Sequence, residues 1–178
     1  MDKKWTVLDA LRHSRHDWLN RLQLVKAHLS LGSTERVHEL IEEFVGESQQ
    51  EARLMNLKTP LFAELLLTYS WEPQPCSLEY EILSDIHTLS HLDEELTAWT
   101  RRFLSVLHPC LDQRKENHLC VTVDQEEEDI RFFFDFRGKL TSIEKMTQWL
   151  AKQESSVFSV SYSLDNEEGS VALQLKKK

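Results

Sequence analysis

The sequence HSRHDWLNRLQ, residues 13–23, decides the expected fold of the N-terminal part of the chain. In a helix, residues three, four and seven positions apart share one face. His13, His16, Asn20 and Gln23 would therefore lie on one polar stripe. A separate apolar stripe consists of Leu8, Leu11, Trp18, Leu22, Val25 and Leu29. The stretch thus predicts an amphipathic helix that carries two imidazoles on its polar face.

This pattern extends into a helical hairpin. The first helix is predicted from about residue 5 to residue 31, where Gly32 supplies a stop. Ser33 or Thr34 can cap the next helix, and a second apolar stripe continues to about residue 57. Residues 1–58 are therefore expected to form a hairpin and a first domain.

The hairpin leaves apolar positions that need further cover. Two helices bury each other along one seam only, and the stripe with Leu8, Leu11, Trp18 and Leu22 is expected to lie in it. The apolar positions left over are Leu19, Leu24, Leu31, Leu40 and Val45. A four-helix bundle made by two identical hairpins is the simplest solution, because symmetric dimers are the commonest oligomers. We therefore expect a homodimer through residues 5–57. In the competing arrangement the hairpin packs on its own C-terminal domain.

Residues 59–178 alternate between helix and strand and are expected to form a second domain. The pattern predicts helices over residues 61–71, 93–115 and 142–152, and strands over residues 77–83, 119–123, 130–136, 158–164 and 170–175. Such an alternation predicts a layer of four or five strands with helices on one face. The expected class is α+β, with a helical hairpin followed by an α/β sandwich.

Composition excludes several classes of protein. The formal net charge of −9 argues against nucleic-acid binding, which needs basic surface. Residues 1–31 nevertheless carry six Lys and Arg against three Asp, so the first helix is a basic strip that can steer an acidic partner. No run approaches the ~20 apolar residues of a membrane span, and no apolar secretory segment is visible. We expect a cytoplasmic protein without membrane contact.

The polar stripe can support phosphoryl transfer. An exposed imidazole is a nucleophile, and its attack on a phosphoryl donor gives a phosphoramidate intermediate. A rigid helix supplies alignment, Arg12, Arg15 or Arg21 could supply positive charge, and Asp17 could orient His16 through its second ring nitrogen. Two alternatives to phosphoryl transfer are considered for these histidines. The histidines can be part of an ordinary solvated face, and a zinc pair would lack a third ligand.

The residues His16–Gln23 resemble the phosphoacceptor box of sensor histidine kinases, in the subgroup where His-Asp is followed by aromatic-Leu-Asn-x-Leu-Gln. The longer run His13–Leu24 is similar to the sporulation initiation phosphotransferase B family of endospore-forming bacteria. Further agreeing runs are Ile41–Glu43, Leu57–Pro60, Leu78–Glu81 and Glu116–Leu119. The resemblance covers most of the chain and is tightest over residues 11–60.

The resemblance implies a dimeric phosphorelay protein whose C-terminal domain is related to the kinase ATP-binding domain. In that family a histidine takes a phosphoryl group from an aspartyl phosphate on a single-domain response regulator. It then passes the group to the aspartate of a DNA-binding response regulator that commits the cell to sporulation. His16 matches the phosphoacceptor, and we place Asp17 and Asn20 with it as catalytic candidates. The expected partner-docking residues are Arg12, His13, Arg15, Leu19 and Gln23.

The C-terminal half favours a relay over a kinase. A histidine-kinase ATP site uses an asparagine-rich helix and glycine motifs that let the backbone approach phosphates. Here Pro109 falls about where the asparagine would stand, and Arg137 takes the place of the first glycine in the run Asp135–Lys139. We therefore expect no ATP chemistry and no cofactor bound by this chain, with Mg²⁺ supplied by the partner regulator.

Two other functions stay open. The chain could be an active histidine kinase with a diverged ATP site, or a non-catalytic dimeric adaptor for response regulators. The chain begins almost at the histidine helix, and this fits an intermediate that receives its phosphoryl group from another protein.

Overall fold

The computed structural model describes residues 5–84, 88–126, 129–153, 155 and 157–176. The chain divides into two compact units, Met1–Gln49 and Gln50–Lys178, and the boundary lies inside the second helix. Among the helices described, none has the length and apolar character that a membrane crossing requires.

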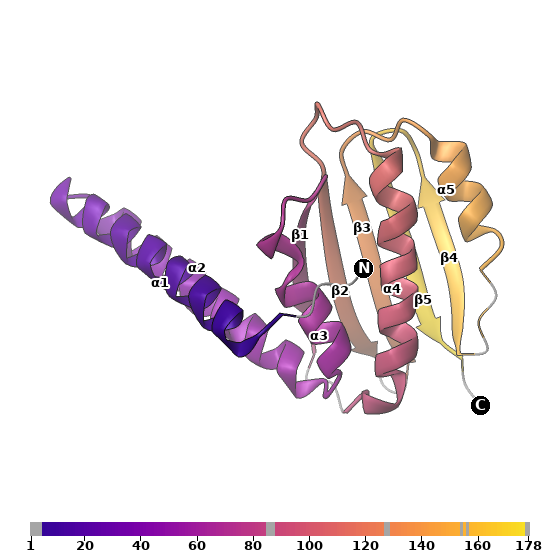
Figure 1. Ribbon diagram of the computed structural model, residues 1–178, viewed down its shortest axis with the longest axis horizontal. Helices are drawn as coiled ribbons and strands as arrows, with labels where there is room; N and C mark the ends of the chain where they lie inside the picture. The colour runs from indigo at the N-terminus through magenta and orange to yellow at the C-terminus, as the bar shows by residue number, and fades with distance from the viewer. Residues whose placement is uncertain (1–4, 85–87, 127–128, 154, 156, 177–178) are drawn as a thin grey trace. The chain divides into compact units, whose positions relative to one another are not determined.

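The first unit contains the predicted hairpin, made of α1 (Val7–Ser30) and most of α2 (Thr34–Asn56) (Figure 1). A capping box begins α1, because the Asp9 N–H donates to Thr6 Oγ1 (3.2 Å) and the Thr6 N–H donates to the Asp9 carboxylate (3.1 Å). Gly32 follows α1 with φ 71°, a left-handed conformation that glycine adopts without steric cost. The turn between the helices is therefore as short as the sequence predicts.

The apolar stripe of α1 is not buried within one chain. The apolar spacing predicts this stripe in the seam between the two helices of one hairpin, and that prediction was wrong. No residue of α1 is buried, and Leu8, Trp18 and Leu22 are 71%, 56% and 58% exposed. The less exposed positions of α1 include Ala10 and Arg21, which lie on a neighbouring stripe, and Val25, at the edge of the apolar stripe next to them. One hairpin therefore leaves its largest apolar surface uncovered.

The second unit contains a five-stranded sheet in the order β1-β2-β3-β5-β4. The strands are β1 (Ser77–Ile82), β2 (His118–Glu126), β3 (Asp129–Arg137), β4 (Phe158–Leu164) and β5 (Glu168–Leu175). The pair β1–β2 is parallel, and the other three pairs are antiparallel. Both predicted hairpins, β2–β3 and β4–β5, are present.

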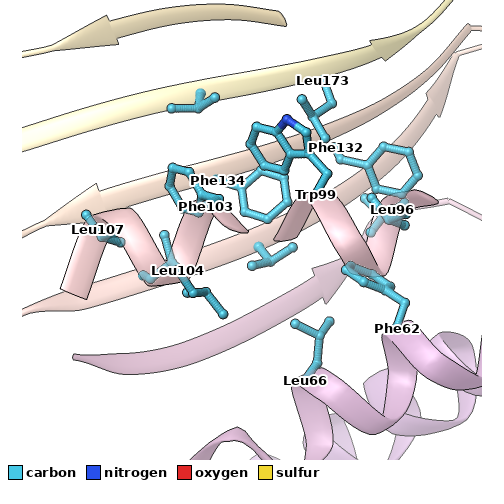
Figure 2. Packing of buried hydrophobic residues seen from close by; sticks show 14 of the residues in the cluster. Phe62, Leu66, Leu96, Trp99, Phe103, Leu104, Leu107, Phe132, Phe134 and Leu173 are labelled. Carbon is cyan, nitrogen blue, oxygen red and sulfur yellow. The ribbon is translucent and has the colours of Figure 1, made fainter. Parts of the chain in front are cut away.

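Helices cover one face of this sheet, as Figure 1 shows for α3 (Pro60–Leu67), α4 (Asp93–Leu107) and α5 (Ile143–Leu150). Alternate strand residues point toward them, because side chains alternate between the two faces of a strand. Phe132 and Phe134 of β3 are fully buried, and Trp99 and Phe103 of α4 pack on Phe134 at ring-centroid distances of 5.1 and 5.3 Å (Figure 2). The predicted α/β layer is confirmed.

One predicted boundary was wrong. The apolar spacing predicts a helix over residues 93–115, whereas α4 ends at Leu107 and a short 3-10 turn, η3 (His108–Cys110), follows. Proline has no N–H to donate and its ring clashes with the preceding helical turn, so Pro109 ends the α-helix. Two further 3-10 turns, η1 (Tyr69–Trp71) and η2 (Ser90–Leu92), connect other elements.

The last two turns of α2 belong to the second unit because they pack in its core and form hydrogen bonds with its first strand. Leu54 and Leu57 are buried in its core. The Ile82 N–H donates to Gln50 Oε1 (2.8 Å), and Arg53 donates to the Ile82 carbonyl (3.0 Å). These two side chains thus satisfy the N–H and the carbonyl of Ile82 at the edge of the sheet. Unpaired, these groups could form hydrogen bonds with a strand of another chain.

Candidate functional site

His16 is an exposed imidazole on a long helix. Its side chain is 73% exposed, and it lies well inside α1, where backbone hydrogen bonds hold the helix on both sides of it. Within the described residues its ring makes two hydrogen bonds, and both involve Nδ1. One joins Nδ1 to Asp17 Oδ1 at 3.4 Å, and the other joins Nδ1 to Asn20 Nδ2 at 3.2 Å. The ring is thus held through one nitrogen, and Nε2 is left for chemistry.

The two contacts make different demands on Nδ1. The Asp17 carboxylate can only accept, so its contact requires an Nδ1–H. The amide nitrogen of Asn20 can only donate, whereas the same amide turned through 180° offers its oxygen as a second acceptor. A carboxylate acceptor makes the stronger hydrogen bond. The tautomer that satisfies Asp17 places the lone pair on Nε2, which is the nucleophilic form of the ring.

The predicted docking residues near His16 differ in their contacts and exposure. The Arg12 guanidinium lies 3.5 Å from Asp9 Oδ1, one turn nearer the start of the helix. His13 is half-buried, with the Trp5 ring edge-on at 5.6 Å. The other three are exposed: Arg15, Leu19 and Gln23. Helical spacing therefore places a mixed basic and apolar surface around the imidazole.

Arg21, which the sequence analysis considered as a source of charge for a phosphate, is engaged elsewhere. Its guanidinium forms an ion pair with Glu47 of α2 and lies over the rings of Phe44 (5.0 Å) and Trp18 (5.8 Å). Its side chain is only 29% exposed. Sequence reasoning missed Glu47, because a pair 26 residues apart depends on the register of the hairpin and not on spacing along one helix.

Gly138 belongs to the run Asp135–Lys139, which was compared above with a glycine motif of kinases, and it is packed against a side chain. Gly138 has φ 156°, and a Cβ placed on it would lie 2.3 Å from Asn117 Oδ1 and 2.9 Å from Asn117 Cα. Arg137, in the position of the first motif glycine, is exposed. Pro109 lies in the 3-10 turn directly after α4. The one glycine of this motif thus makes room for Asn117.

Asn117 is buried and joins several loops. Its Nδ2 group donates to the carbonyls of Asp112 (3.1 Å), Lys115 (3.0 Å) and Pro75 (3.3 Å). Its Oδ1 accepts the N–H of Lys139 at 2.9 Å. A buried amide that satisfies this many backbone groups stabilises the surrounding loops. Sequence reasoning missed this role, because its partners lie 2 to 42 residues away along the chain.

A buried polar chain connects η1 with η3. The Tyr69 hydroxyl lies 2.9 Å from Cys76 Sγ and 2.8 Å from His108 Nε2. Burial raises the pKa of the Tyr69 hydroxyl and of the Cys76 thiol, and it lowers the pKa of His108. The neutral forms suit the geometry, because the thiol can donate to Tyr69 and Tyr69 can donate to His108. In the parts of the chain that the structure describes, no three His, Cys, Asp or Glu residues are placed to hold a metal ion.

Family models match both halves of the chain. The model described as "Sensor_kinase_SpoOB-type, alpha-helical domain" matches residues 1–57, and "Sporulation initiation phospho-transferase B, C-terminal" matches residues 58–176. The chain belongs to the sporulation initiation phosphotransferase B family. A relative in Bacillus subtilis (strain 168), named sporulation initiation phosphotransferase B, is 40% identical over 134 residues, which are 74% of this chain and 70% of that protein. The resemblance stated from the histidine box is thereby confirmed.

Solved structures with low sequence identity are also similar to this family member. A histidine kinase domain from the Erythrobacter litoralis EL346 blue-light activated histidine kinase is 9% identical, with a TM-score of 0.45 over 67% of this chain and 60% of that one. A structure titled "1.7 Angstrom Structure of a Bacterial Phosphotransferase" is 14% identical, with a TM-score of 0.40 over 96% of this chain and 98% of that one.

Proposed function

We propose that this phosphorelay phosphotransferase moves a phosphoryl group between two response regulators through a phosphohistidine at His16. The donor is the aspartyl phosphate of a single-domain regulator, and the acceptor is the aspartate of a DNA-binding regulator that controls sporulation initiation. The single observation that carries the proposal is a solvent-reachable imidazole, held through Nδ1 on a rigid helix, in a chain of this family. We place the reaction in the cytoplasm.

In the first transfer, the Nε2 lone pair of His16 attacks the phosphorus of the donor's aspartyl phosphate. The new bond is P–N, and the bond that breaks joins phosphorus to the donor carboxylate, which leaves with the electron pair. The Nδ1 proton stays on the ring and donates a hydrogen bond to the Asp17 carboxylate, which stabilises the developing positive charge. Asn20 supports the same ring orientation when its amide oxygen faces Nδ1.

The second transfer reverses these steps on another aspartate. A carboxylate oxygen of the acceptor regulator attacks phosphorus in line, the P–N bond breaks, and Nε2 recovers its lone pair. Catalysis of such a transfer is mainly alignment and charge neutralisation. The partner's acidic pocket would hold Mg²⁺, which would supply neutralisation of the phosphoryl oxygens. Arg12 and Arg15 contribute positive charge near His16, and Leu19 and Gln23 belong to the docking surface.

The acting form is a homodimer whose two hairpins make a four-helix bundle. The exposed apolar stripe of α1 and the exposed Ile41 and Val45 of α2 support this proposal, because isolated water-facing stripes of this size are unfavourable. His16 lies on a different stripe of α1, so covering the apolar stripe leaves the imidazole reachable.

ATP is not the phosphoryl source in this proposal. A glycine-rich loop binds phosphates by letting the backbone approach them. The close fit of Gly138 on Asn117 and the exposed side chain of Arg137 both oppose such a loop.

The test follows radiolabel from a phosphorylated single-domain regulator to this protein and onward to a DNA-binding regulator. We expect the wild type to be labelled and His16→Gln to lose transfer by at least about a thousandfold, the scale of loss when an enzyme nucleophile is removed. His38→Gln, which removes an exposed histidine from α2, is the matched control.

Two outcomes favour the alternatives. Full transfer by His16→Gln would refute the nucleophile and support a non-catalytic adaptor. Labelling by ATP and Mg²⁺ alone would support a histidine kinase. Loss of transfer on EDTA treatment, restored by Mg²⁺, is expected if the regulators supply the ion.

A further inference from the structure

Arg21 lies within reach of carboxylates on both helices of the hairpin. Glu47 of α2 forms an ion pair with it in this structure. Asp17 stands four residues before it on α1, and an acid four residues N-terminal to a base is the favourable orientation for a helical ion pair. Arg21 therefore has two competing partners, and the structure shows it paired with the one on α2.

The choice of partner matters because Asp17 has a second use. Its Oδ1 is 3.4 Å from His16 Nδ1, and the Asp17 side chain is 61% exposed. An arginine beside this carboxylate would take its oxygens in charge-assisted hydrogen bonds, which are stronger than the long contact with the imidazole. His16 would then lose the acceptor that favours the Nδ1–H tautomer.

Several contacts hold Arg21 on the α2 side. The guanidinium lies 5.0 Å from the centroid of Phe44 of α2, in addition to its ion pair with Glu47. The ring of Trp18, on the same helix as Arg21, lies 5.8 Å away. Cation–π contacts and a partly buried ion pair both weaken if the guanidinium swings toward Asp17. Of these contacts, the ion pair with Glu47 is the one whose charge a single substitution can neutralise without changing the size of the side chain.

We propose that Glu47 is a positioning residue for phosphoryl transfer: by holding Arg21 against α2, it keeps the Asp17 carboxylate available to orient the His16 ring. Glu47 touches neither the imidazole nor the phosphoryl group, and it acts through Arg21 and Asp17. The inference rests on the proposed function only for its effect on transfer. Its effect on the His16 tautomer holds in the protein alone.

The test compares Glu47→Gln, Arg21→Gln and the double variant. In Glu47→Gln, Arg21 is free to pair with Asp17, and we expect transfer to fall about tenfold, the equivalent of one charge-assisted hydrogen bond. In Arg21→Gln the competitor is gone, so transfer stays within about twofold of the wild type. The double variant should transfer as Arg21→Gln does, so removing Arg21 rescues the loss of Glu47.

A second readout is the tautomer of His16, measured from the ¹⁵N shifts of its ring nitrogens in the dimeric, full-length protein. We expect Glu47→Gln to raise the Nε2–H population and the double variant to restore the wild-type population. Glu43→Gln is the matched control, because Glu43 is exposed one turn earlier on α2 and pairs with Arg36, which keeps Glu39 as a partner. The control should leave both readouts unchanged.

A purely structural ion pair gives a different pattern. Glu47→Gln and Arg21→Gln would then lower thermal stability and transfer alike, the double variant would be no better than Glu47→Gln, and the tautomer would not move. Any one of these three results would overturn the proposal. If His16→Gln retained transfer while the tautomer shift appeared as expected, the proposed function would fail and the positioning role of Glu47 would stand.

Discussion

The hairpin and the sheet unit are both built from amphipathic elements, but only the sheet unit completes its own core. Leu173 of β5 is fully buried beneath the helices, whereas Leu22 of α1 is 58% exposed. Alternate residues of β2 and β3 are almost all inaccessible to solvent, whereas α1 has no buried residue. The same hydrophobic effect thus stabilises the sheet unit within the chain, whereas the hairpin keeps an apolar stripe that would be covered in the proposed dimer.

The proposed function puts the chemistry on the hairpin, the unit that does not bury its own apolar stripe. The proposed function requires His16 to be reachable by two different partners, and a helix in a two-helix unit exposes more of its circumference than a helix on a sheet. The second unit supplies a dense fold in which motif positions such as Gly138 serve packing. The comparison can be tested by changing one region at a time.

The largest effect is expected from Leu22→Glu, which places a charge on the apolar stripe of α1. If two hairpins cover this stripe, each dimer carries the change twice. At about 3 kcal/mol for each copy, the dissociation constant should rise by more than ~10³-fold. Sedimentation velocity between micromolar and millimolar protein measures this shift.

Gln23→Glu adds the same charge on the polar stripe and is the control, with little change in assembly expected. A wild-type monomer at micromolar concentration would contradict the bundle.

The second prediction compares a glycine-to-alanine substitution in the sheet unit with one in the hairpin. Gly138→Ala should destabilise the second unit by about 2 kcal/mol or more, because its φ is left-handed and a Cβ would overlap Asn117. Gly46→Ala should stabilise α2 by about 1 kcal/mol, since a Cβ there meets nothing within 4 Å and alanine favours helix. Urea unfolding followed by circular dichroism measures both changes. If the free energy of unfolding changed in the same direction in both variants, the two glycines would not differ in the way described.

The smallest effect concerns pH and the second unit. Burial lowers the pKa of His108, so the unfolded chain binds its proton more readily than the folded chain. Stability should therefore fall as the pH drops below about 6.5, with a slope of at most ~1.4 kcal/mol per pH unit because one ring binds at most one extra proton in the unfolded chain. His108→Gln keeps an acceptor for Tyr69 and should show less of this loss in thermal unfolding at pH 7 and pH 5. His91→Gln, at an exposed position, should unfold like the wild type at both pH values.

Much of the fold follows from local patterns. Helical spacing with Gly32 predicts the hairpin, and strand alternation predicts β2, β3 and β4 within a few residues. The end of α4 was misplaced, because the apolar spacing continues past Pro109 while the backbone cannot. The stripe of α1 was assigned to the wrong neighbour, because periodicity shows which residues share a face and not which surface covers them.

The chain's own sequence therefore determined the helical setting of His16, Asp17 and Asn20, because residues on one helix keep fixed angular relations. Only the tertiary structure decided that Arg21 pairs with Glu47 and that Asn117 fills the space beside Gly138. These contacts join residues more than twenty positions apart, and their geometry depends on how whole elements pack. Spacing along the chain carries no record of that packing.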